Sequence, residues 1–440
     1  MNKKILITLG LVLVLGASFA QSLNVTKLDS FFQLLETKNK FMGSVTISEN
    51  GKSVYAKSFG KADVETNKRN SAETKYRIGS VTKMFTACLI LKAVEEGKLT
   101  LNQKIDKYFP KIKNAKKISI ENLLCHRSGI HNFTNNEDYG TYYTKPQSKK
   151  ELVEIIAKGQ SDFEPDSASE YSNSNYVLLS YILEETYKKS YSEILNEKIV
   201  KPLDLKNTYF GGKNNIQNNE SYSYKYSEKW KKVTETDMSI PMGAGGIISN
   251  SGDLVIFIES LFANKIINAK SLERMLQIHE KYGLGIIPIY FDGKESFGHS
   301  GWIDGSSSAL YYFPADKVAM AITANGDVIG SKYLMKSVVS IYYHKDFEMP
   351  VFNTIAITTE DLDKYVGVYS TPEIPDFTIT ISKDSLTLMA QGTGEPAIPF
   401  IAIEKDKFEF FAAGIILEFK QAENQMIYSQ GGQSFTMTRK

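Results

Sequence analysis

A serine and a lysine separated by two residues could form an acyl-transfer site in this chain. Ser80 and Lys83 directly precede the apolar run 84–94, whose spacing predicts a helix. Residues three apart share one face of a helix, so the Lys83 amine would lie beside the Ser80 hydroxyl. A serine hydroxyl needs a base, and burial can lower the pKa of a lysine until its amine accepts a proton. A serine in the first helical turn also offers its own N–H to a developing oxyanion.

Ser-x-x-Lys is a weak signal by itself, because the chain holds a second copy from Ser58 to Lys61. That copy contains Gly60 and ends a predicted hairpin strand, where residues three apart face opposite sides. It therefore predicts a surface turn. Taken alone, Ser80 fits an N-cap serine beside a solvated lysine better than it fits a nucleophile.

Two later triplets favour catalysis at Ser80. Tyr171 and Asn173 belong to the only Tyr-x-Asn of the chain, in a loop before a predicted helix at 176–187. His299 begins the only His-x-Gly, on a predicted strand. A half-buried tyrosine and an ordinary strand histidine would explain each triplet singly. Their joint occurrence in this order after Ser-x-x-Lys indicates one catalytic site.

With these motifs the chain resembles the penicillin-recognising serine hydrolases. Within them it looks like the branch of class C β-lactamases, D,D-carboxypeptidases, D-aminopeptidases and related esterases. The segment 123–130 is similar to that branch's Leu-Leu-x-His-x-Ser-Gly, and 245–254 to its later Gly-Gly-x-x-Ser turn and helix. The likeness spans roughly residues 28–345. Residues 365–369 look like the start of the small lipocalin-like β domain that some members carry.

The resemblance implies a role for each catalytic residue. Ser80 would attack an amide or ester carbonyl and become acylated, while Lys83 and Tyr171 would form the proton-transfer pair, either of them being the first base. Class C β-lactamases generally carry a lysine where this chain has His299. Histidine is mostly neutral near pH 7 and could relay a proton to Tyr171. The sequence offers no glutamate for the deacylating role that class A enzymes assign to one.

Further residues would bind the substrate if the resemblance holds. Asn173 would hydrogen-bond its side amide, and Ser300 and Gly301 would line the site. The N–H groups of Ser80 and Trp302 would form the oxyanion hole, where one donor typically lowers the barrier by about 3 kcal/mol.

With histidine rather than lysine at position 299, the chain is similar to the peptidase and esterase members of the branch. We therefore expect a serine hydrolase that cleaves a small amide or ester, such as a D-amino-acid peptide. Two alternatives stay open: a class C-like β-lactamase, and a penicillin-binding protein that is acylated by cell-wall peptides without turnover. The expected partner is a small-molecule or peptide substrate in each case, and no feature sets an oligomeric state.

The surrounding patterns predict an α/β (α+β) fold, in which helices flank an antiparallel sheet and a mainly helical subdomain follows Ser80. After about residue 345, short alternating segments separated by turns predict a small all-β barrel. The expected organisation is a signal peptide at 1–20, a hydrolase domain at 21–345, a linker at 346–360 and a β domain at 361–440.

The first twenty residues differ in kind from the rest. Lys3 and Lys4 precede an apolar run and small residues, which is typical of a cleavable secretory signal. The run is short for a membrane anchor, which needs about 20 apolar residues. We therefore expect a periplasmic or secreted protein with no integral membrane span after cleavage.

Charge and metal-binding residues exclude further function classes. Cleavage would leave 50 basic and 50 acidic residues, so electrostatics gives no reason to expect binding to nucleic acid. The five histidines and two cysteines show no zinc-type spacing, so no metal or other cofactor is expected. Cys88 and Cys125 stand in apolar helical contexts and are predicted to be buried free thiols.

Several conspicuous residues have weaker assignments. His126 is expected to stabilise the turn before the polar loop 131–148 rather than to act in catalysis. The alternating Tyr222, Tyr224 and Tyr226 fit either a wall of the cleft or an exposed strand. The loops 131–148 and 214–230 are expected to determine which substrate is accepted.

Overall fold

A computed structural model describes residues 23–227, 229–352, 357–384, 386–395 and 397–440. The predicted signal peptide lies outside these residues. Within them, no helix combines the length and the apolar character that a membrane crossing requires.

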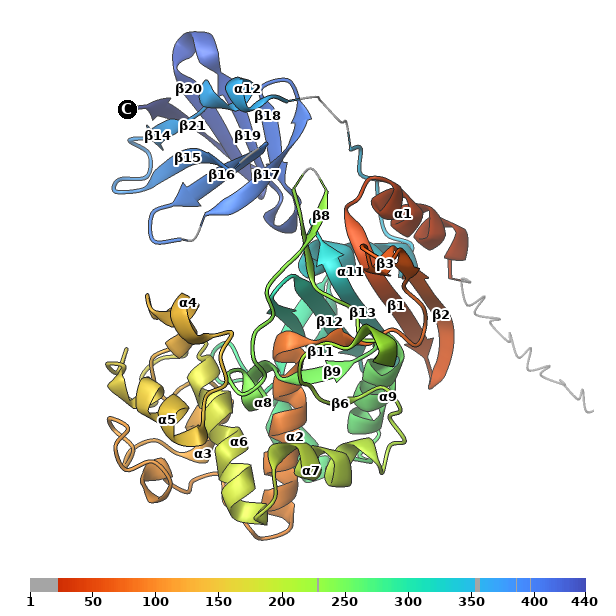
Figure 1. Ribbon diagram of the computed structural model, residues 1–440, viewed down its shortest axis with the longest axis vertical. Coiled ribbons are helices and arrows are strands. Elements are labelled where there is room, and N and C mark those ends of the chain that lie inside the picture. Colours follow the sequence, from red (N-terminus) through yellow and green to blue (C-terminus); the bar gives the residue numbers. More distant parts are fainter. Residues whose placement is uncertain (1–22, 228, 353–356, 385, 396) are drawn as a thin grey trace, which may run out of the picture.

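The centre of the larger domain is a six-stranded antiparallel sheet, seen in the middle of Figure 1. Its order is β10-β11-β12-β13-β1-β2. The strands are β1 (Phe41–Glu49), β2 (Lys52–Phe59), β10 (Ile287–Phe291), β11 (Lys294–Ile303), β12 (Ser306–Phe313) and β13 (Val318–Asp327).

Helices cover both faces of this sheet because its central strands are apolar on both sides. On β13, Met320 and Ile322 face the core beneath α1 (Val25–Thr37) and α11 (Ser331–Tyr342). The alternate residues Ala319 and Ala321 face the opposite core, which includes α2 and α9. The two-residue period of a strand thus divides one segment between two cores.

A mainly helical region lies on one side of the sheet, at the lower left of Figure 1. Its first helix is apolar on every face and is almost entirely buried. Cys88 and Cys125 are buried there as free thiols, as the sequence predicts. The helices in and beside this region are α2 (Thr82–Glu95), α3 (Ile120–Leu124), α4 (Tyr139–Tyr142), α5 (Lys149–Lys158), α6 (Asn173–Tyr187), α7 (Tyr191–Leu195), α8 (Met242–Gly245), α9 (Ser251–Phe262) and α10 (Ala269–Leu276).

Short strands border this region and carry the loops around the site. They form a three-stranded sheet of order β5-β9-β6 and the two pairs β3-β4 and β7-β8. Their bounds are β3 (Lys61–Asp63), β4 (Lys68–Arg69), β5 (Tyr76–Arg77), β6 (Tyr209–Phe210), β7 (Tyr224–Tyr226), β8 (Trp230–Lys232) and β9 (Ile247–Ser249).

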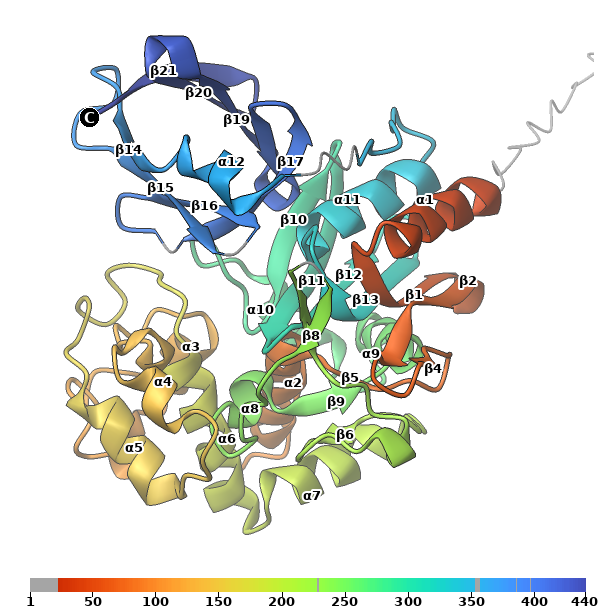
Figure 2. The same cartoon turned by 45° about the horizontal axis from the view of Figure 1, so that its top comes forward.

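The C-terminal strands close into a barrel, which Figure 2 shows almost end-on. Inward side chains such as Phe400, Phe408 and Leu417 fill it. Outside the barrel core, Phe411 packs against Tyr333 of α11 and against Phe352. The barrel comprises β14 (Gly367–Ser370), β15 (Thr378–Asp384), β16 (Thr387–Gly392), β17 (Ile398–Glu404), β18 (Lys407–Phe410), β19 (Ile415–Lys420), β20 (Gln425–Gln430) and β21 (Gln433–Arg439), preceded by α12 (Thr359–Asp363).

The fold class predicted from the sequence is confirmed, but two segments differ. The residue pattern at 282–289 by itself predicts a strand, whereas Gly285 turns the chain with φ +76° and β10 begins only at Ile287. Leu284 and Ile286 of this segment are apolar because they enter the helical core. The loop expected at 131–148 also contains the short helix α4.

Candidate active site

Ser80 lies in a single 3₁₀ turn, Gly79–Val81, immediately before α2. Gly79 has φ +48°, and a Cβ there would come within 2.8 Å of the Trp302 nitrogen. A Cβ on Gly301 would come within 2.9 Å of the Ser80 nitrogen and 2.1 Å of the Ile78 oxygen. Two glycines therefore let the turn and strand β11 meet without side chains between them. The backbone nitrogens of Ser80 and Trp302 lie along this seam, where an oxyanion hole needs its two donors.

The Lys83 amine is fully buried and lies 3.0 Å from the Ser80 hydroxyl oxygen. It also lies 2.8 Å from Asn173 Oδ1 and 2.8 Å from the Ala244 carbonyl oxygen. Desolvation by burial lowers the pKa of Lys83 well below its usual range. A neutral amine has two N–H groups, which match the two carbonyl acceptors and leave its lone pair for Ser80.

Tyr171 contacts the same serine from the loop before α6, donating its hydroxyl to Ser80 Oγ over 2.7 Å. Burial raises the pKa of this phenol above its usual range, so the phenol keeps its proton at neutral pH. The Lys83 nitrogen lies 4.7 Å from the centre of the Tyr171 ring. A lysine whose pKa is lowered by burial and a phenol whose pKa is raised by burial thus face one hydroxyl.

His299 lies beside this group on β11 but is not hydrogen-bonded into it by any described contact. Its ring centre is 6.2 Å from that of Tyr171, and its Nδ1 pairs with the Ser300 carbonyl. Burial and the neighbouring Lys83 lower the pKa of His299 to about 3. The imidazole is therefore neutral, in agreement with the sequence prediction of a neutral group at this position.

His126 supports Tyr171 from behind. Its ring packs 4.5 Å from the Tyr171 ring, and its Nδ1 accepts a hydrogen bond of 3.1 Å from the Ser172 N–H. Burial, Lys83 and His299 lower the pKa of His126 well below its usual range, which keeps that nitrogen available as an acceptor. His126 was expected to stabilise the turn before the loop 131–148, whereas this contact supports the loop before α6.

Arg77 organises the floor of the site from β5, three residues before Ser80. Its guanidinium is buried and donates five hydrogen bonds. The acceptors are Asn214 Oδ1, the Thr236 carbonyl, Asp304 Oδ2, the Gly212 carbonyl and Glu235 Oε2. One side chain therefore holds the loop that follows β6, the segment after β8 and the β11–β12 turn beside Ser80.

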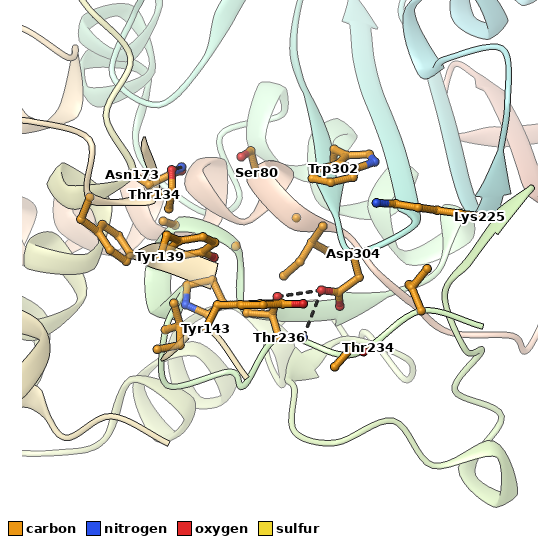
Figure 3. Close-up of a pocket in the computed structure, with 18 of the residues that line it drawn as sticks. Ser80, Thr134, Tyr139, Tyr143, Asn173, Lys225, Thr234, Thr236, Trp302 and Asp304 are labelled. Carbon is orange, nitrogen blue, oxygen red and sulfur yellow. Dashed lines mark hydrogen bonds between the residues drawn. The ribbon is translucent and has the colours of Figure 1, made fainter. Parts of the chain in front are cut away.

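An open cleft of about 700 Å³ begins at Ser80 (Figure 3). Aromatic and amide side chains lie on one side of Ser80, while Trp302 and Lys225 lie on the other (Figure 3). The lining residues are Gly79, Ser80, Phe133, Thr134, Tyr139, Tyr143, Asn173, Lys225, Lys232, Val233, Thr234, Thr236, Ile240, Pro241, Ala244, Gly245, Trp302, Ile303 and Asp304.

The structure brings most of the predicted site together. Hydrogen bonds connect Ser80 with Lys83 and Tyr171, and Lys83 with Asn173. Gly301 abuts the Ser80 turn, with Ser300 beside it on β11. The loop 131–148 does line the cleft, through Phe133, Thr134, Tyr139 and Tyr143.

Of the two alternatives left open for Tyr222, Tyr224 and Tyr226, the cleft wall is wrong. Tyr224 is buried at the base of the β7–β8 hairpin, and neither Tyr222 nor Tyr226 lines the cleft. Lys225, the residue between two of these tyrosines, lines it instead. Sequence reasoning missed Lys225, Lys232 and Asp304, although it did single out the loop 214–230. Alternation indicates which side chains share a face, but not which face meets the cleft.

Comparison with known proteins shows the family of the chain. Residues 31–334 match the Beta-lactamase family. The chain belongs to this family, and its larger domain is that of a serine hydrolase with the β-lactamase fold.

Three relatives illustrate the range of the family. The chain is 27% identical over 309 residues to the teichoic acid D-alanine hydrolase of Staphylococcus aureus, covering 68% of this chain and 74% of the relative. A D-stereospecific amidohydrolase from Streptomyces sp. is 26% identical, with a TM-score of 0.62 and coverage of 72% and 98%. The octameric penicillin-binding protein homologue of Pyrococcus abyssi is 25% identical, with a TM-score of 0.67 and coverage of 94% and 100%.

Proposed function

We propose that the protein is an exported hydrolase that cleaves a small D-configured amide or ester through an acyl-Ser80 intermediate. The observation that carries the proposal is the environment of the Lys83 amine. It is buried, it has two carbonyl acceptors, and it lies 3.0 Å from Ser80 Oγ. A solvated lysine beside an N-cap serine would have none of these features.

In this mechanism Lys83 is the first base. Its lone pair takes the Ser80 proton as Oγ attacks the carbonyl carbon, and the resulting ammonium is stabilised by the Asn173 and Ala244 oxygens. The N–H groups of Ser80 and Trp302 stabilise the oxyanion. Tyr171 then gives its proton to the leaving amine or alcohol and regains one from Lys83. In deacylation these transfers run in reverse. Tyr171 passes its proton to Lys83 and takes one from the attacking water, and Lys83 then protonates the departing Ser80 Oγ.

The D-configured substrate class is supported by two of the relatives. One is described as a teichoic acid D-alanine hydrolase and the other as a D-stereospecific amidohydrolase. The neutral His299 also leaves the position without the fixed charge that a class C-like β-lactamase would have there. Hydrolysis of a D-aminoacyl ester or amide therefore ranks above antibiotic hydrolysis.

Matched esters and amides of D- and L-alanine, together with the β-lactam nitrocefin, test the proposal. We expect turnover of the D substrates, a transient acyl adduct on Ser80 by intact-mass spectrometry, and loss of both in Ser80→Ala. Ser58→Ala, in the second Ser-x-x-Lys, is the matched control and should retain activity.

Other results would replace the proposal. Undiminished turnover by Ser80→Ala would remove Ser80 as the nucleophile. Repeated turnover of nitrocefin with no D-alanyl activity would make the protein a β-lactamase, and a permanent adduct without product would make it a penicillin-binding protein.

A further inference from the structure

The cleft beside Ser80 carries an uneven set of charges. Lys225 and Lys232 line it, and Asp304 is the only acid among its lining residues. Asp304 already accepts three hydrogen bonds: Oδ2 accepts from Arg77, while Oδ1 accepts from the Thr236 N–H and hydroxyl. Its side chain is only 1% exposed. A cation on the substrate would therefore find no free carboxylate among these lining residues.

The two lysines are in the opposite situation. Both are exposed, and neither forms an ion pair with any residue that the structure describes. The Lys225 nitrogen lies 5.6 Å from the centre of the exposed Trp302 ring, and Lys232 lies over the Tyr222 ring. These aromatic contacts orient the amines without neutralising them. The side chains of Lys225 and Trp302 lie close together at one end of the cleft in Figure 3.

The hairpin that carries the lysines is anchored firmly at its base. The buried Tyr224 hydroxyl donates to Glu65 over 2.6 Å and accepts from the Val64 N–H over 2.9 Å. Trp230 packs against Gly326 so closely that a Cβ there would lie 2.7 Å from its ring. These contacts fix both strands and therefore hold the Cα positions of the two lysines.

The position of Tyr171 indicates which part of the substrate enters the cleft. In the proposed mechanism Tyr171 protonates the leaving group, so the leaving group departs on the Tyr171 side of Ser80. Neither Tyr171 nor His299 lines the cleft, whereas Asn173 and Trp302 do. The acyl portion of the substrate is therefore the part that faces Lys225 and Lys232.

We propose that the cleft selects acyl groups bearing a negative charge, a carboxylate or a phosphate-type group, which Lys225 and Lys232 bind. This inference rests on the proposed acyl-Ser80 chemistry and refines its substrate class. It predicts that an acyl group with a free ammonium is a poorer substrate than its neutral or anionic derivative. Lysine amines attract either kind of anion as point charges, so the experiment must compare the two.

The test is a set of p-nitrophenyl esters that share one leaving group and differ in acyl charge. D-Alanyl is cationic, N-acetyl-D-alanyl neutral, and N-succinyl- and N-phosphonoacetyl-D-alanyl anionic. We expect kcat/KM to rise in that order, and the larger gain between the two anions identifies the preferred group. Lys225→Gln/Lys232→Gln should lower kcat/KM for the anionic esters about tenfold and leave the neutral ester within about twofold.

A second double variant that removes two positive charges outside the cleft serves as the control. It separates direct binding by the cleft lysines from the effect of the protein's net charge. Lys229 and Lys231 belong to the same hairpin segment and do not line the cleft, so Lys229→Gln/Lys231→Gln should change each ester by less than about threefold. High salt should remove most of the anionic preference of the wild type. Equal kcat/KM for all four esters would overturn the inference. Equal losses in Lys225→Gln/Lys232→Gln and in Lys229→Gln/Lys231→Gln would overturn it as well. In both cases the proposed acylation of Ser80 would be unaffected.

If no ester is turned over, the proposed hydrolysis fails, and binding is then tested separately. N-succinyl-D-alanine should protect Ser80 from a neutral fluorophosphonate at about tenfold lower concentration in wild type than in Lys225→Gln/Lys232→Gln. Equal protection of both proteins would overturn the anion site. Reaction of the fluorophosphonate at other residues but not at Ser80 would instead disprove the nucleophile.

Discussion

The two sides of Ser80 are built in opposite ways. On one side Lys83 and His299 are almost entirely removed from water, with Lys83 at 0% and His299 at 4% exposure, and Tyr171 is partly buried. On the other side the cleft is open, and its Trp302 side chain is 64% exposed. The shifted pKa values of Lys83 and Tyr171 arise mainly from desolvation, so the buried side can hold a neutral base and a protonated acid. The open side can change its side chains without disturbing that balance.

The largest expected effect comes from removing the buried base. Lys83→Ala should lower the rate of Ser80 acylation by about 10³- to 10⁴-fold, because no other described group combines a lowered pKa with contact to Ser80. Lys61→Ala, in the second Ser-x-x-Lys, should leave the rate unchanged. Stopped-flow measurement of the acylation rate of both variants checks this. If Lys83→Ala lowers that rate less than about tenfold, Tyr171 rather than Lys83 is the first base.

Next in size is a single methyl group at the seam between β11 and the Ser80 turn. Gly301→Ala would place a Cβ 2.1 Å from the Ile78 oxygen and 2.9 Å from the Ser80 nitrogen. The seam must open, so we expect about a 10²-fold loss in kcat as the oxyanion donors separate. Gly140→Ala is the control, since a Cβ there meets nothing within 4 Å. Activity and thermal unfolding of both variants test it, and full activity of Gly301→Ala would place the oxyanion elsewhere.

Acid should destabilise the buried side before it affects the open one. The pKa of His299 is about 3 in the folded protein, against roughly 6.5 for an unfolded histidine. Between these values the unfolded chain binds a proton that the folded chain refuses, so stability falls as pH drops from about 6.5 toward 3. His299 alone should remove about 2 kcal/mol between pH 7.5 and pH 5.

Urea unfolding at the two pH values measures this loss. His299→Gln should reduce it by about the same amount, because glutamine does not titrate. His344→Gln, at an exposed position, should leave the loss unchanged. An identical pH dependence in His299→Gln and wild type would show that the imidazole becomes protonated without penalty.

The smallest effect is expected one residue after Gly301. Trp302→Ala keeps the backbone N–H that faces the seam and removes only an exposed ring and its contact with Lys225. An exposed cation–π contact stabilises by about 0.5–1 kcal/mol, so KM should rise about two- to fivefold with little change in kcat. Steady-state kinetics tests this. A kcat loss in Trp302→Ala as large as that in Gly301→Ala would show that the open side of Ser80 contributes to catalysis as much as the buried side.

The buried side was the more predictable from the sequence, and for a physical reason. Proton transfer needs particular side chains in direct contact, so Ser80, Lys83 and Tyr171 can be recognised from residue type and spacing. Helical spacing then accounts for the pair Ser80–Lys83, even though the structure places Ser80 in a 3₁₀ turn rather than in α2. The contact with Tyr171 came from resemblance, since no local rule brings together residues so distant in the chain.

The open side was poorly predicted because exposed positions carry no such constraint. The period of Tyr222, Tyr224 and Tyr226 indicated a strand, and β7 does cover Tyr224–Tyr226. Which face of that strand meets the cleft depends on the hydrogen bonds of Tyr224 and on the close approach of Gly305 to its backbone. Asp304 likewise follows the His-Ser-Gly motif closely, yet its hydrogen bonds with Arg77 and Thr236 exist only in the folded chain.

The five hydrogen bonds of Arg77 have a consequence for how the protein comes to be active. Their acceptors lie 135 to 227 positions further along the chain, so the guanidinium acquires partners only when distant segments have docked. Contacts of such high sequence separation form slowly, because loop-closure entropy opposes them until many others are in place. Until then a buried cation without its acceptors would be strongly unfavourable. We therefore expect the wall of the cleft to assemble late and cooperatively, so that a nascent chain bearing Ser80 acquires hydrolytic activity only when its domain is complete.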